Sequence, residues 1–211
     1  MRIGVIGAGN IGGTAARLFV RAGHEVAVAN SRGPASLHAL VEELGPRARA
    51  AGVDEAAVFG EVVLLAVPWR TPEALPRAET VRGKVVIDAM NPYTPDFGIY
   101  DLGDSTSSEE TQRRLPGARL VKAFNTIYFQ HLATRGRVDA PLDERQVIFV
   151  AGDDADAKRV VADLIEELGF APVDTGSLRE GGRRQQPGSV IYGKPLTARQ
   201  AREAMEAREE E

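Results

Sequence analysis

The chain has 211 residues, 43% of them hydrophobic and 27% charged, with a net charge of −4 and no cysteine. This is enough apolar material for one core with a small appendage, and too little for two full domains. The mildly acidic charge disfavours nucleic acid and anionic membranes as partners, and the lack of cysteine excludes disulfides, thiolate nucleophiles and cysteine-bound metals.

No leader and no membrane span are expected from the sequence. The amino terminus runs directly into Gly4 and Gly7 and lacks the leucine-rich core of a signal peptide. The longest apolar stretch, residues 62–68, is far shorter than the roughly 18 residues that a spanning helix needs. We therefore expect a cytoplasmic protein with no membrane partner.

Short β-branched runs alternate with helical patterns from the first residue. This alternation predicts βαβ units and an α/β fold of the Rossmann type, a doubly wound and mostly parallel sheet. The strands are expected at residues 2–6, 25–29, 47–51, 61–67, 84–89, 119–124, 146–151 and 170–174. The helices are expected between them, at residues 10–22, 34–44, 54–59, 71–78, 107–115, 126–134 and 153–168, with a last polar helix after Thr197.

Two long loops interrupt this alternation. Residues 91–104 are rich in Pro, Gly and Asp, and a loop of that length often carries function. Residues 176–195 form a second loop, rich in Gly, Arg and Gln. We expect a Rossmann dinucleotide-binding domain over residues 1–124 and a small α/β extension with a C-terminal helix over residues 125–211.

A glycine pattern follows the first expected strand. The run Gly7-Ala8-Gly9-Asn10-Ile11-Gly12 fits GxGxxG and lies between that strand and an amphipathic helix. In such a segment Gly7 permits the tight turn, Gly9 lets the backbone approach a pyrophosphate, and Gly12 permits close packing of helix on strand. The N–H groups at the start of the helix then bind the pyrophosphate. A glycine-rich turn in an unrelated α/β protein is the simpler alternative, which this context disfavours.

The end of the second strand selects between the two nicotinamide dinucleotides. A carboxylate there accepts a hydrogen bond from the 2′-hydroxyl of NAD and repels the 2′-phosphate of NADP. This chain has Asn30, Ser31 and Arg32 at that place, and the hydroxyl and the guanidinium are donors that suit a phosphate. We therefore expect NADP(H) binding, with an ordinary polar turn as the alternative.

Further candidate residues follow the next three strands, because ligands of open parallel sheets bind beyond the carboxyl ends of the strands. Val67 and Pro68 would form an apolar wall at the nicotinamide end, and Trp69 either stacks on the ligand as a lid or packs on a helix. Asn91 and Asn125 would bond the carboxamide of the nicotinamide or hold a loop in place. The expected cofactor-binding residues are therefore Gly7, Gly9, Asn10, Ile11, Gly12, Asn30, Ser31, Arg32, Val67, Pro68, Trp69, Asn91 and Asn125.

No residue is assigned a catalytic role. Reduction of a carbonyl needs a proton donor, and none of the four tyrosines is followed four positions later by lysine. Lys122, at the end of the sixth expected strand, is either such an acid or one partner of an ion pair. The three histidines lack the spacing of metal ligands, so no metal site is expected. Hydride exchange between two stacked rings needs a close, oriented and dry site but no acid, and it fits these residues better.

Several segments together resemble the NADPH-dependent deazaflavin (coenzyme F420) reductases, a family whose fold also forms the oxidoreductase domain of the STEAP metalloreductases. The resemblance covers about residues 1–178 and rests on residues 7–13, 29–32, 66–69, 88–92, 121–126, 152–154 and 174–178. It implies a Rossmann domain with a small extension, NADP(H) held by the Gly7 turn and by Ser31 and Arg32, and a homodimer. It also implies hydride transfer to a tricyclic ring near Pro68, Asn91 and Asn125.

The chain departs from that family after Leu178. Residues 179–188 are basic and polar, where an apolar helix would line a deazaflavin site. A solvated surface loop is the simpler interpretation of this stretch, and a site for the anionic tail of the acceptor is the alternative. Beyond it, Ala198, Ala201 and Met205 form a narrow apolar stripe that faces either the main body or a second subunit.

The sequence thus predicts an NADP(H)-dependent oxidoreductase whose partner is a small-molecule redox acceptor, a deazaflavin or a flavin. Three alternatives remain: a reductase of imines or small hydroxyacids with Lys122 as acid, a non-catalytic NADP(H) sensor, and a metal reductase that acts through a bound flavin. The first of these normally carries a large helical domain after the Rossmann core, and only residues 125–211 remain for it.

Overall fold

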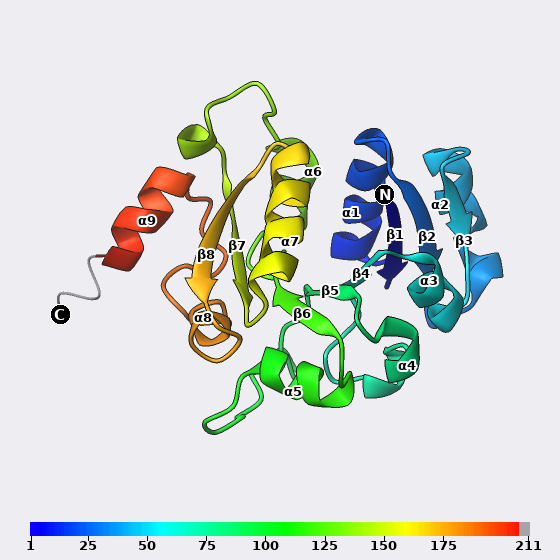
Figure 1. The fold of residues 1–211 in the computed structure, drawn as a ribbon, viewed down its shortest axis with the longest axis horizontal. Helices are drawn as coiled ribbons and strands as arrows, with labels where there is room; N and C mark the ends of the chain where they lie inside the picture. The colour runs from blue at the N-terminus through cyan, green and yellow to red at the C-terminus, as the bar shows by residue number, and fades with distance from the viewer. Residues whose placement is uncertain (207–211) are drawn as a thin grey trace.

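One sheet of eight strands forms the centre of the computed structural model, which describes residues 1–206 (Figure 1). Its strand order is β3-β2-β1-β4-β5-β6-β7-β8, and all neighbouring pairs are parallel except β6 with β7. The strands are β1 Arg2–Ile6, β2 Glu25–Ala29, β3 Ala48–Ala50, β4 Val62–Leu65, β5 Val85–Asp88, β6 Arg119–Lys122, β7 Val147–Gly152 and β8 Ala171–Gly176. The change of winding direction between β1 and β4 confirms the predicted Rossmann-type sheet.

Helices cover both faces of the sheet, because parallel neighbours need crossover connections. The α-helices are α1 Asn10–Arg21, α2 His38–Leu44, α3 Val53–Phe59, α4 Ala78–Val81, α5 Ser107–Arg114, α6 Phe129–Thr134, α7 Ala155–Glu167, α8 Glu180–Arg184 and α9 Ala198–Glu206. Within residues 1–206, three short 3-10 helices join them, η1 Pro34–Leu37, η2 Pro72–Ala74 and η3 Leu142–Glu144.

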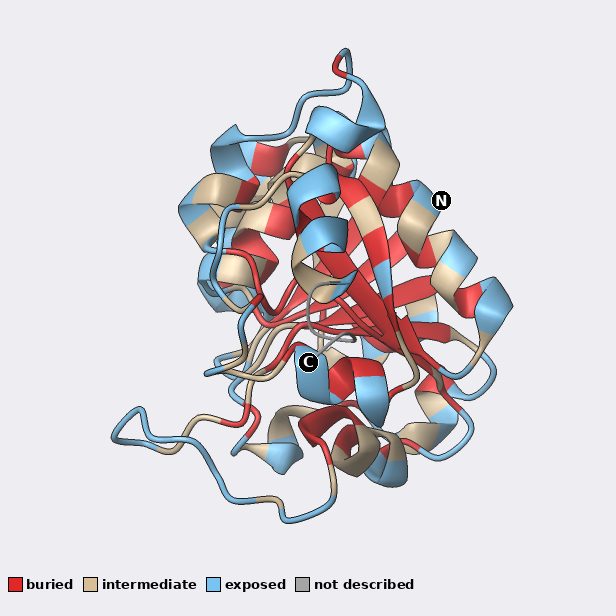
Figure 2. Cartoon of the chain, turned by 90° about the vertical axis from the view of Figure 1, so that its left-hand side faces the viewer, coloured by how far each residue is buried: buried red, intermediate tan, exposed pale blue. Residues whose placement is uncertain are grey.

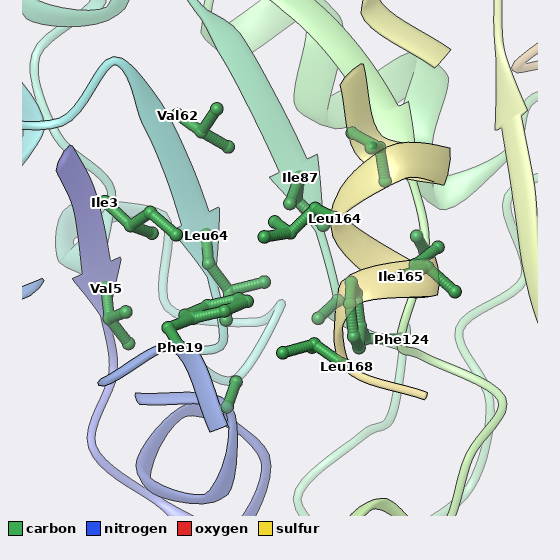
Figure 3. Close-up of a cluster of buried hydrophobic side chains, with 14 of the residues drawn as sticks. Ile3, Val5, Phe19, Val62, Leu64, Ile87, Phe124, Leu164, Ile165 and Leu168 are labelled. Carbon is green, nitrogen blue, oxygen red and sulfur yellow. The ribbon is translucent and has the colours of Figure 1, made fainter. Parts of the chain in front are cut away.

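The core has two layers because successive strand residues point to opposite faces. Leu64 of β4 packs in one cluster with Phe19 of α1 and Leu164 of α7 (Figure 3). The next residue, Leu65, belongs to the other cluster, together with Ala57 of α3. The central strands are therefore buried on both faces (Figure 2), which explains why their sequences are almost continuously apolar.

The carboxyl-terminal part of the chain continues the same sheet in an orientation that the sequence did not predict. β7 runs antiparallel to β6 and pairs with it only through Val121 with Gly152 and Lys122 with Ala151. The rest of β7 therefore continues past the carboxyl end of β6. The predicted boundary at residue 124 stays a prediction, and residues 207–211 of the predicted extension lie outside the described residues.

Three predicted helices differ from the structure, and two of the differences lie at prolines. Residues 71–78 do not form one helix: η2 and the short α4 stand there instead, because Pro76 cannot donate a helical hydrogen bond. The predicted helix over residues 34–44 begins as the 3-10 turn η1 at Pro34. The helix predicted from Thr126 begins only at Phe129, after a turn in which Phe124 has a φ of 64°.

The predicted loop over residues 176–195 contains the helix α8, so that part of the prediction was wrong. Gly181 and Gly182 are buried in α8, and a Cβ at Gly181 would lie 2.7 Å from the carbonyl carbon of Thr175. The absence of a side chain at Gly181 lets α8 pack directly against β8, and Gly182 lies against Thr106 at the start of α5. Gln185, which follows α8, is also fully buried.

The last helix packs on the main body of the same chain. Ala198 and Ala201 of α9 are buried against Phe149 of β7 and Ile191, and Met205 is partly buried there. Of the two predicted partners of this stripe, the main body is therefore the one observed. Within residues 1–206, no helix combines the length and the apolar character that crossing a membrane requires.

Candidate functional site

Five of the predicted site residues form one row along the carboxyl edge of the sheet. The pairing register aligns Ala29, Ile6, Leu65, Asp88 and Lys122 across the strands β2, β1, β4, β5 and β6. Three residues further along each segment stand Arg32, Gly9, Pro68, Asn91 and Asn125. Neighbouring strands lie about 4.8 Å apart, so the row extends over roughly 19 Å. Of these five residues, Gly9, Arg32 and Pro68 line one cavity, and Asn91 and Asn125 are not among the residues that line it.

The glycine turn has the geometry that the sequence pattern predicts. Gly7 has a φ of 104°, and a Cβ there would lie 2.3 Å from the carbonyl oxygen of Ala66. A Cβ on Gly12 would lie 1.8 Å from the carbonyl oxygen of Gly7, so helix α1 packs directly on the turn. At Gly9, by contrast, nothing lies within 4 Å of an added Cβ. Gly9 is thus open toward the space that a ligand would fill.

The first turn of α1 offers hydrogen-bond donors beside this opening. Gly9 is the N-cap residue and has no side chain to accept from the first turn. The first turn also contains no acidic residue that would repel an anion. The predicted residues Asn10 and Ile11 stand in this turn, but they are not among the residues that line the adjoining cavity.

A cavity of about 800 Å³ lies between the glycine turn and the ends of β2 and β4. Seven of the predicted residues line it: Gly7, Gly9, Asn30, Ser31, Arg32, Val67 and Pro68. It is also lined by residues that the sequence did not single out, among them Val53, Thr71, Glu73 and Ala74. These come from the start of α3 and from η2, segments without a recognisable motif, and only the fold brings them to the cavity.

The turn after β2 presents two unpaired donors to the cavity. The side-chain oxygen of Asn30 accepts from the backbone N–H of Arg32 at 3.0 Å, and its amide nitrogen donates to Ser36 Oγ at 2.9 Å. Both bonds fix the turn. The Ser31 hydroxyl and the Arg32 guanidinium are exposed and have no hydrogen-bond partner within residues 1–206. The predicted phosphate donors are therefore available to a ligand.

Trp69 lies outside the cavity and packs against α5. Its side chain is 7% exposed, and its indole N–H donates to the carbonyl oxygen of Ser107 at 3.0 Å. The guanidinium carbon of Arg114 lies 4.7 Å from the ring centroid, within cation–π range. The geometry favours the packing alternative over a ligand-stacking lid.

Lys122 forms a buried ion pair and does not face the cavity. Its Nζ lies 3.3 Å from Asp88 Oδ2 and also donates to the carbonyl oxygen of Met90. Burial lowers the pKa of Lys122, and the neighbouring Asp88 carboxylate opposes this shift. Asp88 in turn accepts from Ser108 Oγ at 2.9 Å and from the Met90 N–H at 3.0 Å. The ion-pair alternative for Lys122 is the one the geometry favours.

Asn91 and Asn125 bond to one another and to the carboxyl-terminal segment. Asn91 Nδ2 donates to the carbonyl oxygen of Asn125 at 2.9 Å and to Tyr192 Oη at 3.0 Å. Asn125 Nδ2 donates to Asn91 Oδ1 at 3.1 Å and to the carbonyl oxygen of Gln185 at 2.8 Å. Of their two predicted roles, these bonds show the loop-holding one. Sequence reasoning missed Tyr192 and Gln185, because no local pattern marks a contact with a residue so distant in the chain.

These features define a class of protein before any relative is considered: a Rossmann-type nucleotide-binding protein with its cavity at the carboxyl ends of the central strands. Comparison with known sequences agrees, since residues 2–92 match the family described as NADP oxidoreductase, coenzyme F420-dependent. The match covers less than half of the chain, so it shows a similarity of this segment to the family.

Three relatives illustrate the similarity. A hypothetical protein of Sinorhizobium meliloti has a solved structure that is 38% identical, with a TM-score of 0.79 over 93% of this chain and 94% of that one. Metalloreductase STEAP3 of Rattus norvegicus is 30% identical over 84% of this chain and 34% of its own length. The F420-dependent NADP reductase of Methanocaldococcus jannaschii is 28% identical over 67% of this chain and 66% of its own. The chain thus spans about a third of STEAP3 and two thirds of the archaeal reductase.

Proposed function

We propose that this protein binds NADP(H) in the cavity beside the glycine turn and transfers hydride between the nicotinamide and a small redox acceptor, a deazaflavin such as coenzyme F420 or a flavin. The observation that carries the proposal is the pairing, in one cavity, of the open Gly9 backbone with the unpartnered donors of Ser31 and Arg32. The similarity of residues 2–92 to the coenzyme F420-dependent NADP oxidoreductases supports the same chemistry.

The cavity residues fit the anionic groups of NADP(H). The opening above Gly9 gives a pyrophosphate access to the N–H groups of the first turn of α1. Ser31 and Arg32 follow β2, and Pro68 follows β4, which is separated from β2 by β1. In Rossmann folds the adenine ribose of a dinucleotide lies at the end of β2. A 2′-phosphate at that ribose would receive charge-assisted hydrogen bonds from both side chains.

The reacting end of the ligand would then lie over Val67 and Pro68. When bound, NADPH supplies the hydride for the reaction. The protein's own contribution is position and a dry surface, which the apolar Val67 and Pro68 side chains provide. Within residues 1–206, the side chain of Lys122 is fully engaged in its buried ion pair. The absence of an assigned acid therefore fits transfer between two rings better than reduction of an imine or a carbonyl.

Titration followed by turnover tests this proposal. NADPH and NADH are added separately to the purified protein and binding is followed by nicotinamide fluorescence. Coenzyme F420, FMN and FAD are then added to the NADPH complex, and oxidation is followed by nicotinamide absorbance. We expect tighter binding of NADPH than of NADH and rapid oxidation by one of the tricyclic acceptors. Tight binding without any oxidation would instead support an NADP(H) sensor.

A further inference from the structure

Two tyrosines that no motif marks bond to each other near the turn after β5, the strand that pairs with β4. Tyr93 follows β5, and Tyr192 lies in the segment after α8. Their hydroxyl oxygens are 3.0 Å apart, and both side chains are half-buried. Asn91 holds Tyr192 through its amide, and Asn91 stands next to Pro68 in the row along the sheet edge. The two phenols therefore stand one strand further along than the residues that line the cavity.

One of the two phenolic O–H groups of Tyr93 and Tyr192 donates to no atom of the described protein. Two phenols carry two protons, and the hydrogen bond between Tyr93 and Tyr192 uses one of them. Asn91 donates its own amide proton to Tyr192 and accepts none from it. No other partner of either hydroxyl exists within residues 1–206. Whichever phenol donates to the other, one O–H remains for a group outside the protein.

The segment that carries Tyr192 is held firmly in this position. Gln185 is fully buried, its amide donates to Thr175 Oγ1 at 2.9 Å, and its carbonyl oxygen accepts from Asn125. Gly193 donates its backbone N–H to the carbonyl oxygen of Thr126 at 3.1 Å. Both ends of the stretch are thus fixed to the turn after β6, so the Tyr192 hydroxyl needs no rearrangement to meet a ligand.

We propose that Tyr93 and Tyr192 form the polar wall of the acceptor site and present one phenolic O–H to the ring that exchanges hydride with the nicotinamide. This inference rests on the proposed function and adds the residues that bind the acceptor ring. The acceptor is a planar conjugated ring with a nitrogen or carbonyl oxygen whose electron density rises when the ring is reduced. Residues 185–193 supply half of the wall and belong to the part of the chain that departs from the family pattern.

The phenols act by hydrogen bonding and keep their protons. Burial, and next the bond to Tyr93, raise the pKa of Tyr192, so its phenol stays neutral at physiological pH. In the transfer, a C–H bond of the dihydronicotinamide breaks, and the hydrogen moves with its electron pair to the acceptor ring. The ring heteroatom then carries the added charge, bonded to the phenol, until water protonates it. A hydrogen bond to this charge is stronger after the transfer than before it, so it favours the forward step.

The experiment compares Tyr93→Phe, Tyr192→Phe and the double variant, with Tyr128→Phe as matched control. Tyr128 is 51% exposed and its hydroxyl has no partner within the described residues. Each single variant retains one phenolic proton and so keeps most of the rate of FMN reduction by NADPH. The double variant has none, and we expect kcat to fall by between about 10-fold and 150-fold, the range for a hydrogen bond to a charged group. The NADPH dissociation constant stays unchanged in all of them.

A spectroscopic measurement supplies a readout independent of turnover. FMN is titrated into the wild type and the double variant, each saturated with NADP+, which has no hydride to transfer. The visible absorption bands of bound FMN are expected to shift in the wild type and to shift less in the double variant. Melting temperatures of all variants show whether each one folds. If the double variant does not fold, the spectral shift of bound FMN is compared between the wild type and the two single variants.

The outcomes separate this inference from the proposed function. An unchanged rate and spectrum in the double variant would overturn the phenolic wall and leave the proposed function intact. The phenolic wall would also be overturned if the kcat losses of the two single variants multiplied to the loss of the double variant while the melting temperature fell in parallel. The phenols would then act only by stabilising the fold. A wild type that binds NADPH but neither binds nor reduces FMN or a deazaflavin would overturn both. A wild type that binds FMN more tightly than the double variant does, but whose NADPH is oxidised by none of coenzyme F420, FMN and FAD, would keep the wall and reject the proposed function.

Discussion

Replacing Arg32 by alanine is expected to separate the two nicotinamide cofactors. The Arg32 guanidinium lines the cavity, is exposed and bonds to nothing else within residues 1–206. Because it has no competing carboxylate, its whole donor capacity is available to a 2′-phosphate. Arg32→Ala should therefore weaken NADPH binding and leave NADH binding nearly unchanged.

The expected size follows from the strength of one charge-assisted contact. A hydrogen bond to a charged group contributes about 2 kcal/mol, which corresponds to a roughly 30-fold rise in the dissociation constant. The side chain is exposed, so solvent and salt reduce this value. We expect the loss to shrink when ionic strength rises. Arg32→Lys should recover part of the affinity, since it keeps the charge but not the bidentate geometry.

The assay is fluorescence titration of NADPH and NADH at two salt concentrations, with Arg21→Ala as the control. Arg21 is exposed like Arg32, and it ends α1 at the opposite edge of the sheet. It should affect neither cofactor. Equal losses of NADPH and NADH affinity in Arg32→Ala, or no loss of either, would refute the assignment of Arg32 to the 2′-phosphate.

Three further predictions concern the glycine turn, the buried ion pair and the assembly. Gly9→Ala should keep the melting temperature and weaken NADPH binding, because its Cβ meets no protein atom within 4 Å, whereas Gly12→Ala should lower the melting temperature through its 1.8 Å contact. Asp88→Ala should cost about 3–5 kcal/mol in urea unfolding because it leaves Lys122 buried without its partner. If Lys122→Met abolished activity without changing stability, Lys122 would be an acid and our interpretation of it would be wrong. We propose a homodimer, and a monomeric mass in light scattering would exclude it.

The parts of the fold that the sequence predicts well are those determined by neighbouring residues. The glycine turn could be predicted because Gly7 and Gly12 are required by contacts within the turn itself and with Ala66. Strands β1 and β2 were predicted to the residue, since each is a short apolar run bounded by turn signals. In these segments local preference and tertiary packing agree.

The parts that sequence reasoning missed depend on contacts between distant segments. For Trp69 the sequence leaves ligand stacking and packing on a helix open, and only its bond to Ser107 shows that it packs on α5. Tyr192 lies in a stretch whose Gly, Arg and Gln content predicts a solvated loop. The structure instead contains α8 there, because Gly181 allows a helix to approach β8 closely. Neither contact leaves a periodic signal in the sequence.

The two halves of the crevice therefore differ in what determines them. The cofactor half is built from the turns after β1, β2 and β4, and its residues follow a pattern common to many dinucleotide-binding proteins. The other half is built where β7 continues past the end of β6 and the stretch through Gln185 to Gly193 returns over Asn91 and Asn125. A change in that stretch leaves the cofactor half untouched. If the acceptor binds there, as we propose, variation after α8 is a route by which proteins of this fold would change the acceptor and retain the same nicotinamide donor.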